Sequence, residues 1–250
     1  TQVAAATLGL PLDRVRVSIG RSDFPATPPH GGSMTMASVG SAVRAACLAA
    51  QEEAAKQAAG DQRSVVFGAS ADAVEWSEGR LRRKGDTTPG QTYQDVVRSL
   101  GGPIEVQASN HRDPHAAERY SMHSFGAVFA EVEVDPDVGT IRVSRALGVY
   151  GAGRIVNPLL ARSQCIGGMI GGIGVGLMER TMLDARDGRP YNAHMADYLV
   201  PVNLDIGNLD GDFVEEEDPH VNPLGVKGLG EIALVGMAPA IANAMFHATG

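Results

Sequence analysis

The chain has 250 residues, of which 44% are hydrophobic and 20% charged, a balance typical of globular proteins and outside the range of disordered ones. Its formal net charge of −8 makes nucleic acid or an anionic membrane surface a poor partner, because both require clustered positive charge. Two cysteines cannot form a disulfide framework or a four-thiolate metal site by themselves. The uncharged run 164–178 is too short to span a bilayer, so we expect no membrane insertion.

The ends of the chain predict that it is part of a longer protein. It begins with Thr1 rather than methionine, and no basic and apolar signal sequence follows. Residues 3–8 form an apolar run closed by Gly9, which is typical of the last turns of a helix whose start is missing. We therefore expect a piece of a longer polypeptide, or one half of a split subunit.

Two elements are expected between these residues and position 60. Apolar and polar side chains alternate over 15–19, which predicts a half-buried strand. A loop rich in proline and glycine follows at 22–32. Apolar residues then recur at helical spacing within an alanine-rich stretch, which predicts a long helix over 35–59.

The middle of the chain contains short elements and a candidate boundary. Its patterns predict three strands and one helix, at 64–67, 73–76, 81–83 and 93–100. The second and third of these strands are predicted to form a pair joined by Glu78 and Gly79. Gly101, Gly102 and Pro103 form the best internal boundary. We therefore expect one α+β subdomain over 1–102, with a loop and helix at 31–59, and a second α+β subdomain over 103–250.

The second half predicts a hairpin and two helices. Two β-rich runs, 126–134 and 140–149, are separated by Asp-Pro-Asp-Val-Gly, a turn sequence in which proline presets φ and glycine accepts a positive φ. Residues 159–182 have the length of a helix despite six glycines, which would let another backbone or a ligand come close. A last apolar helix is expected over 232–246, starting or kinking near Pro239.

Several motifs that carry chemistry are absent. The glycines of 151–176 and 228–236 lack the spacing of the dinucleotide-binding fingerprint, and none of the three lysines stands in a P-loop. No Gly-x-Ser-x-Gly elbow occurs. His111 and His115 have the spacing of a helical zinc pair, but Pro114 breaks the helix that the pair would need. A nucleotide-dependent dehydrogenase, a zinc enzyme and a serine hydrolase are therefore poorly supported.

Two polar segments remain as candidates for a site. In 30–38 a glycine loop delivers backbone N–H groups and hydroxyls onto a helix start, which attracts anions such as phosphate. Capping of the helix by Ser33 or Thr35 explains the same residues without a ligand. Gln164 is a polar amide at the head of the glycine-rich helix, and a solvent-facing glutamine explains it equally well.

Glu231 is the third candidate. It follows a glycine loop and leads into an apolar helix, so we expect a buried carboxylate suited to accept a proton near neutral pH. The alternative is a first-turn glutamate that is stabilised by the helix dipole. The acidic residues 215–218 are interpreted as a solvated face, and Asp135 and Asp137 as part of a turn.

Taken together, these segments resemble the molybdenum-cofactor subunit of the xanthine dehydrogenase and aldehyde oxidase family. The resemblance covers nearly the whole chain and is tightest after residue 123. It is carried by 124–139, by Gly-Arg-Ile-Val-Asn-Pro at 153–158, Gln-Cys-Ile-Gly-Gly at 164–168, Lys-Gly-Leu-Gly-Glu at 227–231, and 238–250. The loop 28–33 most resembles the bacterial aldehyde-oxidising branch, which carries the cytosine dinucleotide form of the cofactor.

The resemblance implies a role for each segment. Glu231 falls on the family's catalytic glutamate and Gln164 on a glutamine beside the cofactor, so both are catalytic candidates. The residues implied to bind the cofactor are Gly32, Ser33, Met34, Thr35, Met36, Ala37, Ser38, Gln164, Lys227 and Gly230. In the family the pterin's dithiolene sulfurs hold molybdenum, so no side chain is expected as a metal ligand.

The resemblance also implies an α+β fold with mixed β-sheets packed with helices, the carboxy-terminal molybdopterin-binding portion of a molybdenum hydroxylase. The implied reaction is oxidation of aldehydes to carboxylic acids, or hydroxylation of heteroaromatics such as purines, with water as the oxygen source. A non-catalytic fragment or paralogue that acts only in complex assembly is the alternative. The presence of both Glu231 and Gln164 stands against it, because a decayed site would be free to lose either.

The implied partners supply what this chain lacks. Its sequence contains no iron–sulfur or flavin motif, so iron–sulfur clusters and FAD are expected on an iron–sulfur subunit and an FAD subunit. The amino-terminal half of the catalytic subunit is expected on the same or a separate chain. The implied location is the cytoplasm, or the periplasm by export on a partner's signal.

Overall fold

The computed structural model describes residues 1–110 and 113–250 and divides the chain into two compact units. The units are made of these segments: Thr1–Pro29 with Ser38–Asp113, and His30–Ala37 with Pro114–Gly250. This division differs from the expected one at residue 102. Ile104 packs on the core of the first unit, so that unit extends beyond the glycine pair, and the loop His30–Ala37 belongs to the second unit.

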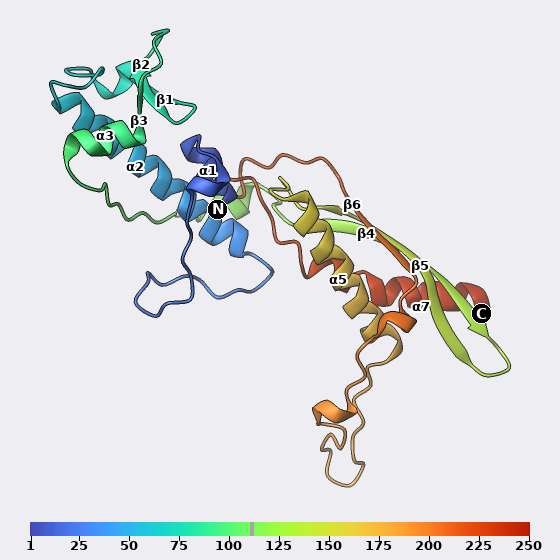
Figure 1. The fold of residues 1–250 in the computed structure, drawn as a ribbon. Helices are drawn as coiled ribbons and strands as arrows, with labels where there is room; N and C mark the ends of the chain where they lie inside the picture. Colours follow the sequence, from blue (N-terminus) through green and yellow to red (C-terminus); the bar gives the residue numbers. More distant parts are fainter. Residues whose placement is uncertain (111–112) are drawn as a thin grey trace. The chain divides into compact units, whose positions relative to one another are not determined.

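The first unit combines three helices with a small antiparallel sheet. Its elements are α1 (Gln2–Leu8), α2 (Ser41–Gly60), α3 (Tyr93–Leu100) and the strands β1 (Val74–Ser77), β2 (Arg80–Arg83) and β3 (Gln91–Thr92), paired in that order (Figure 1). The helices expected near 3–8, 35–59 and 93–100 are confirmed. The start of the second is a π-helix over Met36–Gly40 rather than an α-helical turn. Sequence spacing alone does not distinguish these two windings.

The hairpin β1–β2 is confirmed, and two other predicted strands are wrong. Glu78 and Gly79 both adopt positive φ, as a two-residue hairpin turn requires. Residues 15–19 alternate correctly but form no strand, and Ile19 is 83% exposed, because no described strand lies beside them. Residues 64–67 form turns, in which Ser64 and Val66 are buried and Val65 and Phe67 are exposed.

The second unit is built on a mixed sheet. Strands β4 (Phe125–Asp135) and β5 (Thr140–Gly151) form the predicted hairpin, and β6 (Asn208–Phe213), which the sequence did not reveal, pairs parallel to β5. The helices of this unit are α4 (Ala116–Arg119), α5 (Pro158–Leu177), α6 (Ile232–Val235) and α7 (Met237–Thr249). The mixture of helices with an antiparallel and a mixed sheet agrees with the expected α+β class.

A bulge in β5 sets which side chains face the helices. The pairing shifts between Glu131 and Val132, so that Ser144 is an extra residue in β5. On one side of the shift Val143 is buried, and on the other side Ala146 and Tyr150 are buried, so the inward phase changes by one residue. The bulge therefore keeps both halves of the long strand on the same core.

The core of the second unit lies between this sheet and α5, α6 and α7. Its fully buried side chains come from β5 and from all three helices: Val143, Ala146, Tyr150, Cys165, Met169, Ile173, Ala233, Met237 and Ile241. Glycines on α5 let the other helices come close. A Cβ on Gly168 would lie 2.9 Å from the Cβ of Ala233, and one on Gly172 would lie 2.9 Å from the carbonyl oxygen of Leu234. The glycine-rich pattern is therefore explained partly by helix packing.

One described segment, Ile232–Thr249, is long and apolar enough by length and composition to cross a membrane. It consists of α6 and α7, which meet at Gly236, and Met237 and Ile241 are buried in the core. The core thus accounts for part of its apolar character.

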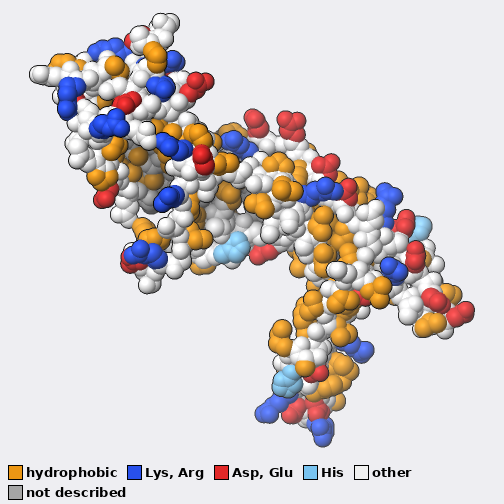
Figure 2. All heavy atoms as spheres, viewed as in Figure 1, with side chains coloured by type: hydrophobic (Ala, Val, Ile, Leu, Met, Phe, Trp, Pro, Cys, Tyr) orange, Lys and Arg blue, Asp and Glu red, His pale blue; other side chains and the backbone are white. Residues whose placement is uncertain are grey.

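The segment between α5 and β6 contributes little to this core. Most of its large apolar side chains are exposed, and Ile206 packs on the core. The exposed ones include Met195, Leu199, Val200, Val202 and Leu204. Figure 2 shows hydrophobic side chains along this part of the surface. A single bridge joins Leu183 to Pro190. The site is therefore positioned by the sheet and the helices rather than by this segment.

Replacing Gly172 by alanine tests the helix packing. Because the new methyl group would contact Met237 and Leu234, we expect Gly172→Ala to lower the free energy of unfolding by about 1–3 kcal/mol. Gly167→Ala is the matched control, because nothing lies within 4 Å of its Cβ position, and it should raise stability by up to about 1 kcal/mol. Equal stability of the two variants in chemical denaturation would contradict the packing.

Candidate active site

The loop His30–Ala37 makes a tight turn before the long helix. Gly32 and Ser33 both adopt positive φ, at 61° and 58°. The Nδ1 atom of His30 is hydrogen-bonded to the hydroxyl of Thr35, which closes the loop on itself. Met34, Thr35 and Met36 are exposed, whereas Ala37 is buried. The loop therefore presents its polar backbone and its central side chains at the surface of the second unit.

The residues 227–231, which we call the glutamate loop, pack directly on this turn. A Cβ on Gly228 would overlap the carbonyl oxygen of Gly32, so only glycine fits at that contact. The backbone N–H of Glu231 donates to the hydroxyl of Ser33 at 3.1 Å. Two segments separated by 198 residues in the sequence thus share a hydrogen bond.

Gln164 meets the same two segments. It lies in the first half of α5, whose start is capped by the Asn157 side chain and by Pro158 at its first turn. A Cβ on Gly230 would lie 3.0 Å from the Ser33 hydroxyl oxygen and 3.1 Å from Gln164 Oε1. The three candidate segments of the sequence therefore converge around Gly230.

The neighbour of Gln164 has a different role. Cys165 faces the core, where burial raises the pKa of its thiol to about 11. The thiol therefore stays protonated at neutral pH and is not a thiolate ligand. Among the described residues, no group of three or more His, Cys, Asp or Glu side chains is placed to hold a metal ion. His111, one member of the histidine pair noted above, lies outside the described residues.

The prediction that Glu231 is buried is wrong. Glu231 is exposed at the residue before α6, and Gln164 is exposed as well. The reason is local: Ala233 and Met237 take the core-facing positions of the following helices, so the glutamate is turned toward the surface. Both side chains therefore belong to an open face that Gly230 and Ser33 share.

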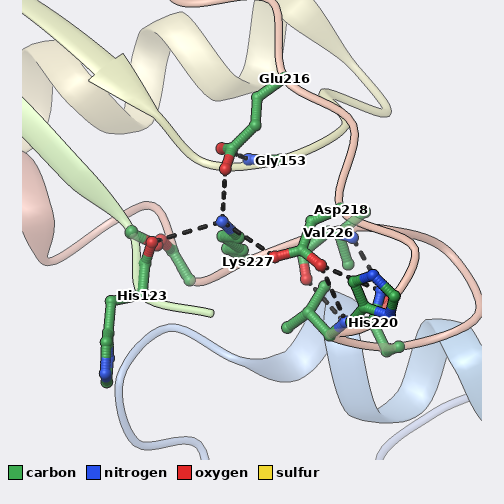
Figure 3. Close-up of polar contacts among 11 residues, drawn as sticks. His123, Gly153, Glu216, Asp218, His220, Val226 and Lys227 are labelled. Atoms are coloured by element: carbon green, nitrogen blue, oxygen red, sulfur yellow. Dashed lines mark hydrogen bonds and ion pairs between the residues drawn. The ribbon is translucent and has the colours of Figure 1, made fainter. Parts of the chain in front are cut away.

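Lys227 occupies a buried ionic cluster that the sequence analysis missed (Figure 3). Its side chain is only 4% exposed, and its Nζ atom lies 2.5 Å from Glu216 Oε1 and 3.1 Å from Asp218 Oδ2. It also donates to the carbonyl oxygen of His123 at 3.3 Å. The interpretation of 215–218 as a solvated face is therefore wrong for Glu216 and Asp218. The available signal was a lysine inside an apolar glycine loop, which needs a counter-charge when buried.

The electrostatics of this cluster follow from its contacts. Burial alone would lower the pKa of Lys227, but the hydrogen bonds and charges of Glu216 and Asp218 outweigh it, and the pKa is raised. Burial alone would raise the pKa of Asp218, but hydrogen bonds from Lys227 and from the backbone of His220 and Val221 hold that pKa below its usual value. All of these contacts therefore favour the charged forms.

The family model described as "Molybdopterin cofactor-binding domain" matches residues 1–207. The chain belongs to this molybdopterin cofactor-binding family. The match includes the turn at Ser33 and Gln164, and it ends before the glutamate loop.

Two curated relatives extend the similarity to the whole chain. The aldehyde oxidoreductase molybdenum-binding subunit PaoC of Escherichia coli K12 is 36% identical over 249 residues, which is 100% of this chain and 32% of that protein. The putative xanthine dehydrogenase molybdenum-binding subunit XdhA of the same strain is 31% identical over 260 residues, covering 100% and 33%. This chain thus spans about a third of the length of these relatives.

The fold also matches a solved structure. A crystal structure of the Cu,Mo-CO dehydrogenase superposes with a TM-score of 0.81 at 24% identity, covering 97% of this chain and 30% of that one. At this identity the likeness concerns the fold. It confirms the mixed helix and sheet architecture expected from the sequence.

Removing the Ser33 hydroxyl should loosen the contact between the turn and the glutamate loop. Because Ser33→Ala takes away the acceptor of the Glu231 N–H, we expect hydrogen exchange at that amide to quicken by about fivefold, equivalent to a hydrogen bond of about 1 kcal/mol. Ser121→Ala, at an exposed position, is the control. Unchanged exchange at Glu231 would show that the hydroxyl does not restrain the loop.

Lowering the pH should weaken the ionic cluster by protonating Asp218. A carboxylate with a lowered pKa contributes stability that is complete above its unfolded pKa, near 3.9, and is lost as the pH falls through the folded value. The difference in free energy of unfolding between the parent chain and Asp218→Asn should therefore be largest at pH 6 and shrink toward pH 3. A difference that does not change with pH would contradict the ion pair.

Proposed function

We propose that this chain is part of the catalytic subunit of a molybdenum hydroxylase that oxidises aldehydes to carboxylic acids with water as the oxygen source. The observation that carries the proposal is the convergence of Ser33, Gln164 and Glu231 around Gly230. The choice of aldehydes over heteroaromatics such as purines is supported by the higher identity to the aldehyde oxidoreductase subunit, 36% against 31% for the xanthine dehydrogenase subunit.

The residues of the open face fit a molybdopterin cofactor. The turn at Gly32 and Ser33 exposes backbone and hydroxyl groups, which suit the polar pterin and its phosphates. Gly228 and Gly230 keep their side of the face free of side chains, and a Cβ would fill the space at Gly230. The residues proposed to hold the cofactor are Gly32, Ser33, Met34, Thr35, Met36, Gln164 and Gly230, with the cytosine dinucleotide form expected. Ala37 is left out because its side chain is buried, and Ser38 because it belongs to the first unit.

Each side chain has a distinct task in this proposal. The bound cofactor supplies the two-electron oxidation of the substrate. Glu231 accepts, at a carboxylate oxygen, the proton that the water-derived oxygen loses as the new carbon–oxygen bond forms, and its backbone N–H is anchored at Ser33. Gln164 offers both an amide donor and an acceptor next to Gly230, which can orient the cofactor or the substrate. Exclusion of water from this exposed face is assigned to the rest of the subunit.

The proposal includes partners that supply the remaining functions. The rest of the catalytic subunit would cover the face that holds Gln164 and Glu231. Iron–sulfur clusters and FAD on separate subunits would carry the electrons away. The complex would work in the cytoplasm, or in the periplasm after export on a partner's signal.

A single charge-removing substitution tests the catalytic role. In the complete complex, Glu231→Gln should lower aldehyde turnover by at least a thousandfold while molybdenum and pterin content stay at the parent level, because the amide cannot accept the proton. Glu217→Gln is a matched control, since Glu217 is exposed outside the site.

Two outcomes would overturn the proposal. Turnover retained by Glu231→Gln would remove the carboxylate from the reaction. A parent complex that contains no molybdenum would favour the alternative, a fragment that acts only in assembly.

A further inference from the structure

We infer that Lys227 is a positioning residue, which holds the glutamate loop through Glu216 and Asp218 so that Glu231 stands beside Ser33 and Gln164. The inference rests on the proposed function, because it gives Glu231 its catalytic role. It replaces the direct contact with the cofactor that the sequence suggested for Lys227.

The ammonium group of Lys227 has no capacity left for a phosphate or a pterin. It has three protons, and three acceptors surround it: Glu216 Oε1 at 2.5 Å, Asp218 Oδ2 at 3.1 Å and the carbonyl oxygen of His123 at 3.3 Å. The side chain is 4% exposed. Binding a ligand would require breaking one of these buried contacts, so the arrangement favours a structural partner over a cofactor contact.

The two carboxylates are in turn fixed to other parts of the second unit. Glu216 Oε2 accepts the backbone N–H of Gly153, just after β5, at 2.7 Å. Asp218 Oδ1 accepts the N–H groups of His220 and Val221 at 3.0 and 3.1 Å. Every oxygen of the pair is therefore used, and Lys227 joins the end of β5 to the 218–221 turn (Figure 3).

The glutamate loop is anchored again on the way to Glu231. The N–H of Lys227 donates to the carbonyl of Ala152 at 3.0 Å, and the carbonyl of Gly228 accepts from the Ser124 hydroxyl at 2.6 Å. Glu231 follows with its bond to Ser33. Only three residues lie between Lys227 and Glu231, and two of them are glycines. A loop this short transmits a displacement at Lys227 to the Glu231 carboxylate.

The test uses the complete complex and separates positioning from binding and from folding. Lys227→Met keeps an unbranched apolar chain and removes the charge, so we expect kcat to fall at least tenfold with KM within about twofold. Molybdenum and pterin content should stay at the parent level, and hydrogen exchange of the 228–231 amides should quicken in both the loaded and the cofactor-free complex. Lys84→Met, at an exposed lysine of the first unit, should change none of these quantities.

Parallel variants make the outcomes distinguishable. Loss of the cofactor in Lys227→Met would overturn the inference, because Lys227 would then bind it directly. So would turnover and exchange at the parent level. If Lys227→Met does not assemble, Asp218→Asn is the deciding variant, because it retains an acceptor. A fall in kcat with faster exchange in that variant supports the inference, and parent values overturn it.

If Glu231→Gln retains turnover, the proposed function fails, whatever Lys227→Met shows. If Glu231→Gln is inactive and Lys227→Met is not impaired, only the positioning role fails.

Discussion

Close approach of backbones is the constraint on which both the core and the site of the second unit depend. Gly168 and Gly172 bring α5 against α6 and α7, and Gly228 brings the glutamate loop against Gly32. A side chain at any of these positions would separate segments that are distant in sequence. The same packing that buries Met237 therefore also delivers Glu231 to Ser33, so the fold and the candidate chemistry share one requirement.

Much of the fold could be predicted from local patterns, and the failures have physical causes. The helices, the hairpin β4–β5 and the turn at Glu78 and Gly79 follow from periodicity and turn chemistry, which are local properties. The strand expected at 15–19 has the right alternation and no described neighbour to pair with. Strand β6 has two aspartates and a glycine among its six residues. It forms because it pairs with the free edge of β5, and this pairing cannot be read from a local sequence pattern.

The site could also be predicted only in part from the sequence, because local patterns single out residues and do not record their long-range contacts. Ser33, Gln164 and Glu231 could be singled out because each stands at a glycine-rich approach, and the family resemblance joined them. The sequence could not decide between a buried Glu231 and a glutamate at a helix start, because the answer depends on which residues of α6 and α7 take the core positions. The pairing of Lys227 with Glu216 and Asp218 depends on how the 218–221 turn folds back, so the acidic run looked like an ordinary solvated surface.

The distance in sequence between Ser33 and Glu231 bears on how the protein is made. The turn at Gly32 and Ser33 leaves the ribosome 198 residues before the amide that completes its hydrogen bond. The parallel edge of β5 has no partner until β6 is synthesised, and the contacts around Gly230 cannot form before residues 227–231 are made. Closing so long a loop costs chain entropy, and only the packing of the finished core offsets that cost. Assembly of the site is thus a late event in the folding of these residues, because Ser33 gains its partner only once Glu231 has been made.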